Sequence, residues 1–336
     1  MILHLVIPGL LGPWPADLTL PRPVVPALEW LLARAEIAEV PSSIEALLFQ
    51  QFGLLVADED DLPIAAVTAL ADGCEPGDGW WLRADPVHLR PDVQGVLLVD
   101  ARALAIEPVE AAALAAAFDQ TFAEDGLQLR VPCPERWYLR LLEYPGLRTY
   151  SLHDAIGRDI NPLLPQGPNK RRWHTLLTEA QMLFHAHPVN RARDERRQPM
   201  INGLWLWGGG SLPEGAQAPA AQLYADDPLT RGLARLANVP VRSVPENADE
   251  WQEHAHHADS LIVLDSTRYD RADSDPLAWV DHLAELERNW FAPCQRRLKS
   301  GQISALHLYG GQGRRYSLTG AARWRFWRRS RPVSQW

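Results

Sequence analysis

Basic and aromatic side chains alternate near the C-terminus of this 336-residue chain, over residues 313–332. Guanidinium groups attract phosphate and rings stack on bases, so the pattern is typical of single-stranded nucleic-acid or membrane-surface binding. Residues 322–326 also alternate as a half-buried edge strand would, with Trp324 and Phe326 on one side. We expect residues 322–326 to form such an edge strand. The alternative is that the arginines of this region form an exposed basic patch. The arginines that would contact a protein or nucleic-acid partner are Arg323, Arg325, Arg328, Arg329 and Arg331.

Three histidines, His254, His256 and His257, lie within four residues of one another. On a helix, residues 254 and 257 would share a face, which is a spacing that could hold a metal ion. A zinc site needs a third protein ligand, and none is evident in the sequence nearby. We therefore interpret this segment as the exposed surface of a helix over 248–257.

The composition is that of an ordinary water-soluble globular protein. Hydrophobic residues make up 46% and charged residues 22% of the chain, which provides enough apolar surface for a core. The net charge of -9 disfavours nucleic-acid binding by the chain as a whole. The three cysteines are far apart and form no CxxC pair, so we expect reduced thiols in a cytoplasmic protein. No segment offers the roughly 20 apolar residues of a membrane span.

The hydrophobic pattern predicts an α/β core. A buried strand over residues 2–7 begins it, followed by a helix over 44–52 with Ser42 or Ser43 as its N-cap. From residue 228 onward, helices alternate with short strands. This alternation is typical of a parallel sheet with helices on both faces.

A smaller unit interrupts that core. Paired strands beginning at residue 80 and an alanine-rich helix over 108–123 indicate an α+β arrangement. We therefore expect a discontinuous core formed by residues 1–75 and 205–336, with residues 76–204 inserted as an α+β domain of the kind that binds substrate.

Four segments resemble the archaeal-type cofactor-independent phosphoglycerate mutases. The segment over residues 185–213 is the most specific, because an HPVN motif, an arginine three residues later and NGLWLWGGG occur together in it. A second resemblance is to proteobacterial proteins described as regulatory protein RpfE-type, which are similar in length. The four segments are WWLRADPVHLRPDVQGVLLVDARALAIEPVEAAALAAAF (80–118), SLHDAIGRDINPLLPQG (151–167), HAHPVNRARDERRQPMINGLWLWGGGSLP (185–213) and LYADDPLTRGLARLANV (223–239).

The mutase resemblance implies an alkaline-phosphatase-like core, two metal ions and a serine that attacks the phosphoryl group. Ions in such sites lie roughly 3.5–4 Å apart and are held by several Asp and His side chains at strand ends. This sequence departs from that pattern. The first strand ends at Pro8 and Gly9 where a carboxylate is implied, and the last core strand offers only His307.

Other ligand and nucleophile positions are also incomplete. After the strand near Leu261 the acids are Asp265, Asp270 and Asp273, and the next histidine is His282. Serine or threonine nucleophile candidates are Ser42, Ser43 and Thr68, none of which lies in a recognisable motif. We expect no metal site, no catalytic residue and no cofactor; an active form would need a divalent ion such as Mn²⁺, Zn²⁺ or Mg²⁺.

The inserted unit nevertheless retains side chains suited to a small anion. Arginine binds phosphate or carboxylate through paired hydrogen bonds, and amides or imidazole can orient hydroxyl groups. The alternative is that these residues only connect loops and hairpins, with the tryptophans packed in the core. The candidate ligand-binding residues are Arg83, Arg102, His153, Asp154, Asn190, Arg193, Asn202, Trp205 and Trp207.

Three functional hypotheses remain open from the sequence. The first is a non-catalytic descendant of the mutase fold with a binding or regulatory role, and we favour it. The second is an active phosphoglycerate mutase or related phosphotransferase with rearranged ligands. The third is an adaptor that binds nucleic acid or protein through the arginine-rich C-terminal segment.

Overall fold

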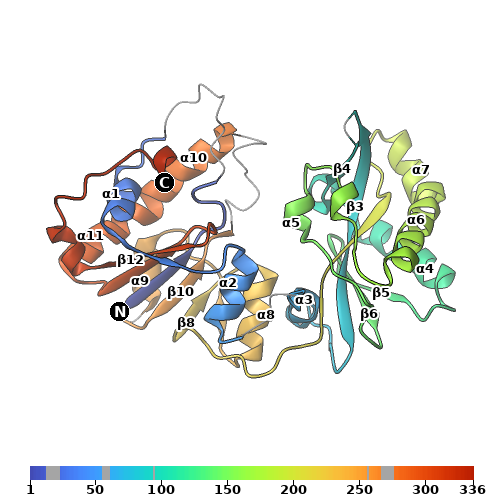
Figure 1. The fold of residues 1–336 in the computed structure, drawn as a ribbon, viewed down its shortest axis with the longest axis horizontal. Coiled ribbons are helices and arrows are strands. Elements are labelled where there is room, and N and C mark those ends of the chain that lie inside the picture. The colour runs from blue at the N-terminus through green and yellow to red at the C-terminus, as the bar shows by residue number, and fades with distance from the viewer. Residues whose placement is uncertain (13–22, 55–60, 94, 256, 266–275) are drawn as a thin grey trace. The chain divides into compact units, whose positions relative to one another are not determined.

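The computed structural model describes residues 1–12, 23–54, 61–93, 95–255, 257–265 and 276–336. It divides into two units: unit 1 comprises Met1–Leu55 and Gly215–Trp336, and unit 2 comprises Val56–Glu214 (Figure 1). Each unit has its own sheet and its own core. Among the described residues, no helix combines the length and the apolar character that crossing a membrane requires.

The described strands of unit 1 form a mainly parallel sheet in the order β2-β12-β11-β1-β10-β8-β9. β1 pairs in parallel with both β10 and β11, whereas β12 pairs antiparallel with β11 and β2. The parallel sheet predicted from the alternating pattern is therefore confirmed. The strands are β1 (Ile2–Val6), β2 (Glu36–Glu39), β8 (Gln222–Tyr224), β9 (Val241–Arg242), β10 (Ser260–Val263), β11 (Ala305–Tyr309) and β12 (Arg314–Thr319).

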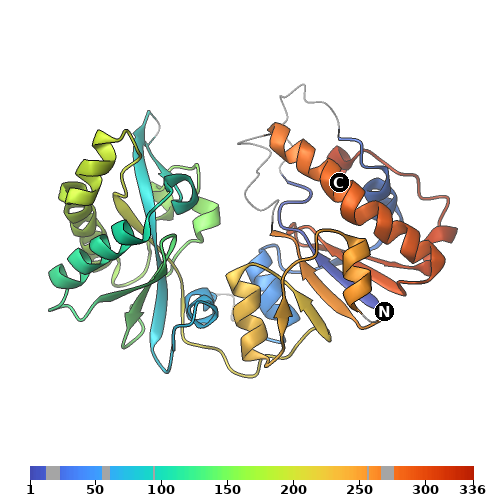
Figure 2. The same ribbon diagram turned by 180° about the vertical axis from the view of Figure 1, so that it is seen from behind.

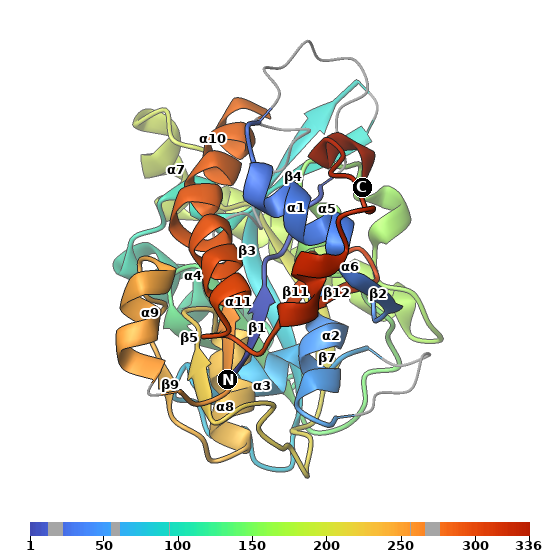
Figure 3. The same cartoon turned by 90° about the vertical axis from the view of Figure 1, so that its left-hand side faces the viewer.

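Helices cover both faces of this sheet. α1, α9, α10 and α11 bury their apolar sides against alternate residues of the central strands, such as Leu5 and Leu308. These helices lie on one side of the sheet (Figure 3), while α2 and α8 lie on the other side (Figures 1 and 2). Ser43 caps α2 as predicted, its Oγ accepting a hydrogen bond from Ala46 N at 3.0 Å. The helices are α1 (Pro26–Arg34), α2 (Ile44–Gln51), α8 (Pro228–Leu236), α9 (Ala248–Ala255), α10 (Pro276–Leu286) and α11 (Ala292–Ser300), with a π-helical turn, η4 (Glu287–Phe291), between the last two.

The C-terminal segment is not the edge strand that its alternation predicts. After β12, residues Gly320–Trp324 form a short 3₁₀ helix, and turns follow. The segment after β12 instead leaves the sheet, because Ala322 and Val333 are buried in the core of unit 1 and Arg325 Nη1 donates to Arg34 O at 2.8 Å at the end of α1. The helix predicted over 248–257 also ends early, at Ala255, and His257 has a positive φ of 63°. His254 and His257 therefore do not share a helical face, and residue 256 lies outside the described residues.

Unit 2 is built on an antiparallel sheet in the order β4-β3-β6-β5, with β7 paired to β3. α4 and α6 pack on one face, against residues such as Leu82 and Trp137. α3 packs on the other face, against Trp81 and Tyr138. The elements are α3 (Ile64–Ala71), β3 (Trp80–Asp92), β4 (Gly95–Val99), α4 (Pro108–Thr121), β5 (Gln128–Cys133), β6 (Arg136–Leu141), α5 (Leu152–Ala155), α6 (Lys170–Ala186), α7 (Pro188–Glu195) and β7 (Gly203–Gly210).

The unit boundaries differ from those expected at residues 75 and 205. Ala65, Ala66 and Ala69 of α3 are buried against the sheet of unit 2, which assigns this helix to unit 2 instead of unit 1. β7 likewise pairs with β3 along its whole length. Small alanine side chains let α3 approach the sheet closely, and nothing in their local pattern distinguishes the two units.

Candidate functional site

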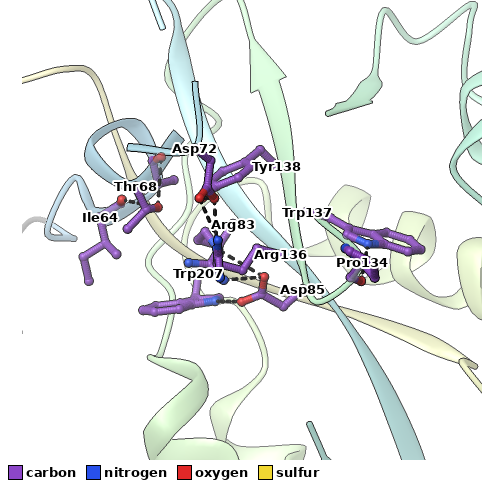
Figure 4. A network of polar contacts seen from close by, with 11 residues as sticks. Ile64, Thr68, Asp72, Arg83, Asp85, Pro134, Arg136, Trp137, Tyr138 and Trp207 are labelled. Carbon is purple, nitrogen blue, oxygen red and sulfur yellow. Dashed lines mark hydrogen bonds and ion pairs between the residues drawn. The ribbon is translucent and has the colours of Figure 1, made fainter. Parts of the chain in front are cut away.

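Arg83 and Asp85 form a buried ion pair on one face of the unit 2 sheet (Figure 4). They are two residues apart on β3, so their side chains project from the same face. Arg83 Nη2 donates to Asp85 Oδ1 at 2.7 Å, Arg83 Nε donates to the same oxygen at 3.0 Å, and Trp207 Nε1 donates to Asp85 Oδ2 at 2.7 Å. Burial lowers the pKa of Arg83, but the charge of Asp85, the neighbouring Tyr138 and the hydrogen bond to Asp85 together raise it above its ordinary value. The Arg83 charge is thus compensated within the chain.

A second ion pair lies beside the first on the same face. Arg136 donates to Asp72 through Nε at 2.9 Å and Nη2 at 2.7 Å, and the Tyr138 hydroxyl donates to Asp72 Oδ2 at 2.6 Å. Burial would raise the pKa of Asp72, but the hydrogen bonds from Arg136 and Tyr138 and the Arg136 charge lower it overall. The Arg83 guanidinium lies 5.3 Å from the centre of the Tyr138 ring, which joins the two pairs into one network.

Asp72, Asp85, Arg136 and Tyr138 were not among the candidate residues predicted from the sequence. One signal for Asp85 was available, since a residue two positions from Arg83 on a predicted strand must share its face. Asp72 and Arg136 are separated by 64 residues in sequence. Only the packing of α3 against the sheet brings them together.

His153, on α5, joins the same network. Its ring lies 5.9 Å from the Trp207 ring, centroid to centroid. Burial lowers the pKa of His153 to about 4; the charges of Arg102 and Arg83 lower it further, and Asp154 opposes them. The imidazole is therefore neutral near pH 7, and it lies within the field of two arginines.

Arg102 is the candidate arginine with the most solvent-exposed side chain. It pairs with Asp100 through Nε at 2.8 Å and through Nη2, and 43% of its side chain is exposed. The structure therefore brings three of the predicted residues together, because the Arg83 guanidinium lies 5.2 Å from the centre of the Trp207 ring and His153 lies beside the same ring. Arg102 acts on His153 through its charge. Asp154 lies at the border of this cluster, where its carboxylate accepts a hydrogen bond from Ser151 Oγ at 2.8 Å.

Arg193 and Asn190 are not part of this cluster. Arg193 is buried between α7 and α4, where Nη1 donates to Glu110 Oε2 at 2.5 Å, Nε donates to Pro199 O at 2.8 Å, and Nη2 donates to Leu104 O. Arg193 therefore lies apart from Arg83, because it belongs to the α4 side of the sheet and Arg83 to the α3 side. Asn190 ties the end of α6 to the segment that precedes β7, its amide donating to Phe184 O at 2.7 Å and to Ile201 O at 2.8 Å.

Asn202 and Trp205 also make contacts that support the fold. Asn202 pairs with the backbone of Leu89, accepting from its N–H at 2.7 Å and donating to its carbonyl at 3.0 Å. Trp205 Nε1 donates to Tyr150 O at 3.0 Å. These two residues, like Asn190 and Arg193, fit the alternative interpretation, in which polar side chains connect loops and hairpins.

The ends of the central strands in unit 1 form the edge at which open α/β sheets bind their ligands. β1 is followed by Ile7, Pro8 and Gly9, β10 by Leu264 and Asp265, and β11 by Gly310 and Gly311. A Cβ on Gly311 would lie 3.1 Å from Ile44 Cδ1, so the N-terminus of α2 reaches this edge. In the described part of the chain, no group of three or more His, Cys, Asp or Glu side chains is placed to hold a metal ion. Asp270 and Asp273 lie outside the described residues.

His282 and His307 lie on opposite sides of the unit 1 sheet. His307 alternates with Leu306 and Leu308, which face the core beneath α10, and its Nδ1 is 2.9 Å from Ser317 Oγ. His282 is on α10 and lines a cavity of about 190 Å³ beside Leu264. These two histidines therefore cannot share one ion. Thr68 belongs to unit 2, where its hydroxyl donates to Ile64 O at 2.7 Å.

Comparison with known proteins gives short matches in sequence and long ones in structure. No protein-family model matches the chain. A 2,3-bisphosphoglycerate-independent phosphoglycerate mutase from Methanosarcina barkeri is 33% identical over 72 residues, covering 21% of this chain and 18% of the relative. One from Methanothrix thermoacetophila is 36% identical over 99 residues, covering 28% and 25%. The aligned parts thus span a quarter or less of these relatives.

Two solved structures are similar over most of the chain. The PH0037 protein from Pyrococcus horikoshii matches with a TM-score of 0.55 and 13% identity, over 95% of this chain and 87% of that one. A cofactor-independent phosphoglycerate mutase from Thermoplasma acidophilum matches with a TM-score of 0.47 and 18% identity, over 95% and 89%.

The fold class predicted from the sequence is confirmed: a mixed α/β protein whose mainly parallel sheet is flanked by helices, with a smaller α+β unit inserted. Within that class, the chain is distantly related to the cofactor-independent phosphoglycerate mutases.

Proposed function

We propose that this chain is a non-catalytic relative of the phosphoglycerate mutases, with a binding or regulatory role. The observation that carries the proposal is the identity of the residues at the ends of the central parallel strands. A two-ion site needs several carboxylate and imidazole ligands, and the positions after β1 and β11 hold Pro8, Gly9, Gly310 and Gly311. Proline and glycine offer no side-chain ligand for an ion. A regulatory role like that suggested by the RpfE-type resemblance is part of this proposal.

The ligand that we propose is a small anion, of the chemical class of the phosphorylated three-carbon acids. It would bind in unit 2, beside Arg102 and His153. The support is electrostatic, because the charges of both Arg102 and Arg83 act on the neutral His153 ring. An anion placed there would gain chiefly from Arg102, because the charge of Arg83 is compensated by Asp85 and Arg102 is solvent-exposed enough to contact it.

The non-catalytic part is tested by turnover. Purified full-length protein is supplied in turn with Mn²⁺, Zn²⁺ and Mg²⁺ and assayed for interconversion of 2- and 3-phosphoglycerate and for phosphate release. We expect neither activity with any ion, and no stoichiometric metal in elemental analysis of the protein as isolated. Metal-dependent turnover abolished by Ser43→Ala would overturn this part in favour of an active enzyme with rearranged ligands.

The anion part is tested separately by thermal unfolding. A ligand that binds the folded state stabilises it by about 2.7 kcal/mol at one hundred times its Kd, which shifts the Tm of a unit of this size by several degrees. We expect 3-phosphoglycerate to raise the Tm of the wild type but not that of Arg102→Gln. Arg172→Gln is the matched control, since Arg172 lies in the same unit with 64% of its side chain exposed. An equal shift in both variants would place the anion elsewhere.

A further inference from the structure

The charges of this acidic chain are strongly segregated. Residues 288–336 contain 11 of the 33 lysines and arginines and none of the 42 acidic residues. The negative net charge therefore belongs entirely to the preceding part of the chain. A basic surface on an otherwise acidic protein attracts polyanions locally without making the whole molecule bind them.

Three large aromatic side chains are exposed inside this basic region. Trp324, Phe326 and Trp327 are 64%, 76% and 66% exposed. The rings of Phe326 and Trp327 meet edge to face at 5.4 Å, and the Arg323 guanidinium lies 5.0 Å from the centre of the Trp324 ring. Exposed aromatic groups gathered in four residues are unusual on a monomer and mark contact surfaces.

The segment that carries these rings, residues 323–331, is called the aromatic loop below, and it is anchored at both ends. Ala322, before it, and Val333, after it, are buried in the core of unit 1. Within the loop, Arg325 Nη1 donates to Arg34 O at 2.8 Å and Arg328 Nη1 donates to Ala35 O at 2.6 Å, at the C-terminal end of α1. Anchoring lowers the entropy that binding would otherwise cost.

Further basic groups border the aromatic loop. Arg323 Nη1 donates to Lys299 O at 3.3 Å, which places the end of α11 next to it. The Lys299 ammonium and the Arg34 guanidinium lie 4.5 Å and 4.8 Å from the centre of the Trp30 ring. Arg329 and Arg331 are exposed. Arg34 of α1 and Lys299 of α11 thus add basic groups beside the aromatic loop, where both pack on Trp30.

We propose that the aromatic loop binds single-stranded nucleic acid, with bases stacked on Trp324, Phe326 and Trp327 and phosphates bound by the neighbouring arginines. Flat rings alternating with guanidinium groups match a strand that alternates bases with phosphates. A membrane surface is a poorer fit, because interfacial binding uses an amphipathic helix, whereas the helical segments after β12 are 3₁₀ turns of five and three residues. This role is independent of the anion site in unit 2.

The experiment measures the fluorescence anisotropy of labelled 20-nucleotide dT and rU probes titrated with the full-length protein at about 50 mM salt. We expect saturable binding that weakens as salt rises, because counterions are released when phosphates are neutralised. The triple variant Trp324→Ala, Phe326→Ala, Trp327→Ala should bind at least about tenfold more weakly, given the stacking contribution of each base. Its matched control is Leu142→Ala with Met182→Ala, two exposed apolar side chains of unit 2.

A charge-reversal pair tests the arginines. Arg329→Glu with Arg331→Glu should weaken nucleic-acid binding and make it less dependent on salt. The control, Arg171→Glu with Arg172→Glu, makes the same change in net charge in unit 2, and it should have a smaller effect on both quantities. The proposal is overturned if the wild type does not bind either probe, or if the triple alanine variant binds as the wild type does. It is also overturned if the protein binds phosphatidylserine vesicles through the aromatic loop but neither oligonucleotide.

Discussion

The carboxylate of Glu287 accepts a hydrogen bond from the backbone N–H of Ala27 at 2.6 Å, although 260 residues separate them in sequence. Its other oxygen accepts from Leu28 N at 3.0 Å, so one buried side chain caps the N-terminus of α1. Glu287 begins the π-helical turn between α10 and α11. This contact connects the two chain segments that make up unit 1.

Replacing Glu287 with alanine should destabilise unit 1 by about 1–3 kcal/mol, because two backbone donors lose their acceptor and a helix N-terminus loses a negative charge. Glu285→Ala, an exposed position on the preceding helix, should change the free energy of unfolding by less than about 0.5 kcal/mol. Urea unfolding monitored by circular dichroism measures both. Equal effects of the two substitutions would show that the cap contributes nothing.

Asp85→Ala should be among the most destabilising substitutions in unit 2. It leaves the Arg83 guanidinium buried without its carboxylate, and breaking such a pair costs about 3–5 kcal/mol. The double variant Arg83→Met, Asp85→Asn should recover much of that loss, because the charge is removed and the amide oxygen still accepts from Trp207. Asp125→Ala is the control, since its pair with Arg172 is 3.6 Å long and exposed, and such pairs contribute less than about 1 kcal/mol. Equal losses for D85A and the double variant would refute the expectation.

Gly210→Ala should destabilise unit 2 by about 1–3 kcal/mol through overpacking. A Cβ on this residue would lie 2.7 Å from Pro63 Cα, at the start of α3. The run of three glycines in β7 therefore permits a close approach between this strand and α3. Gly320→Ala is the control, since its Cβ would meet nothing closer than 3.7 Å. Unchanged thermal stability of G210A would contradict this interpretation.

Stability should fall as pH drops below about 6.5, through the histidines on the unit 1 sheet. Burial lowers the pKa of His4 to about 4, and the neighbouring His307 adds to the effect. Burial and then the Arg315 charge lower the pKa of His307. The rings are 4.8 Å apart, centroid to centroid, and His4 Nδ1 is 3.1 Å from the Tyr309 hydroxyl.

The direction of this change in stability with pH follows from proton linkage. The folded state binds these protons less readily than the unfolded chain, so the full contribution is present above the unfolded pKa of 6.5 and is lost as pH falls toward 4. The loss is at most about 1.4 kcal/mol per pH unit for each histidine, and Asp259 reduces it for His4. Urea unfolding at pH 7 and pH 5 should therefore show a smaller decrease for His4→Asn, His307→Asn than for the wild type. An equal decrease in the free energy of unfolding in the wild type and in the double variant would exclude these two histidines as the cause.

Much of the secondary structure followed from local patterns in the sequence. The first strand, the helix capped by Ser43 and the long strand that contains Arg83 were predicted because periodicity and capping act over a few neighbouring residues. Alternation in Ala322–Phe326 failed as a guide, since a period of two also occurs outside strands, and whether such a segment joins a sheet depends on its tertiary context. β12 was missed for the related reason that its pairing with β11 and β2 is non-local.

The candidate site depended far more on tertiary structure. By itself, the sequence determined the chemical inventory: arginines and a histidine suited to an anion, two core strands followed by proline or glycine, and basic residues interleaved with aromatic ones at the C-terminus. Tertiary structure alone decided that Arg83 and Arg193 lie on opposite faces of a sheet, each with its own carboxylate, and that Trp324 is exposed. The physical reason is that side-chain partners and burial come from packing between elements distant in sequence, which no local pattern encodes.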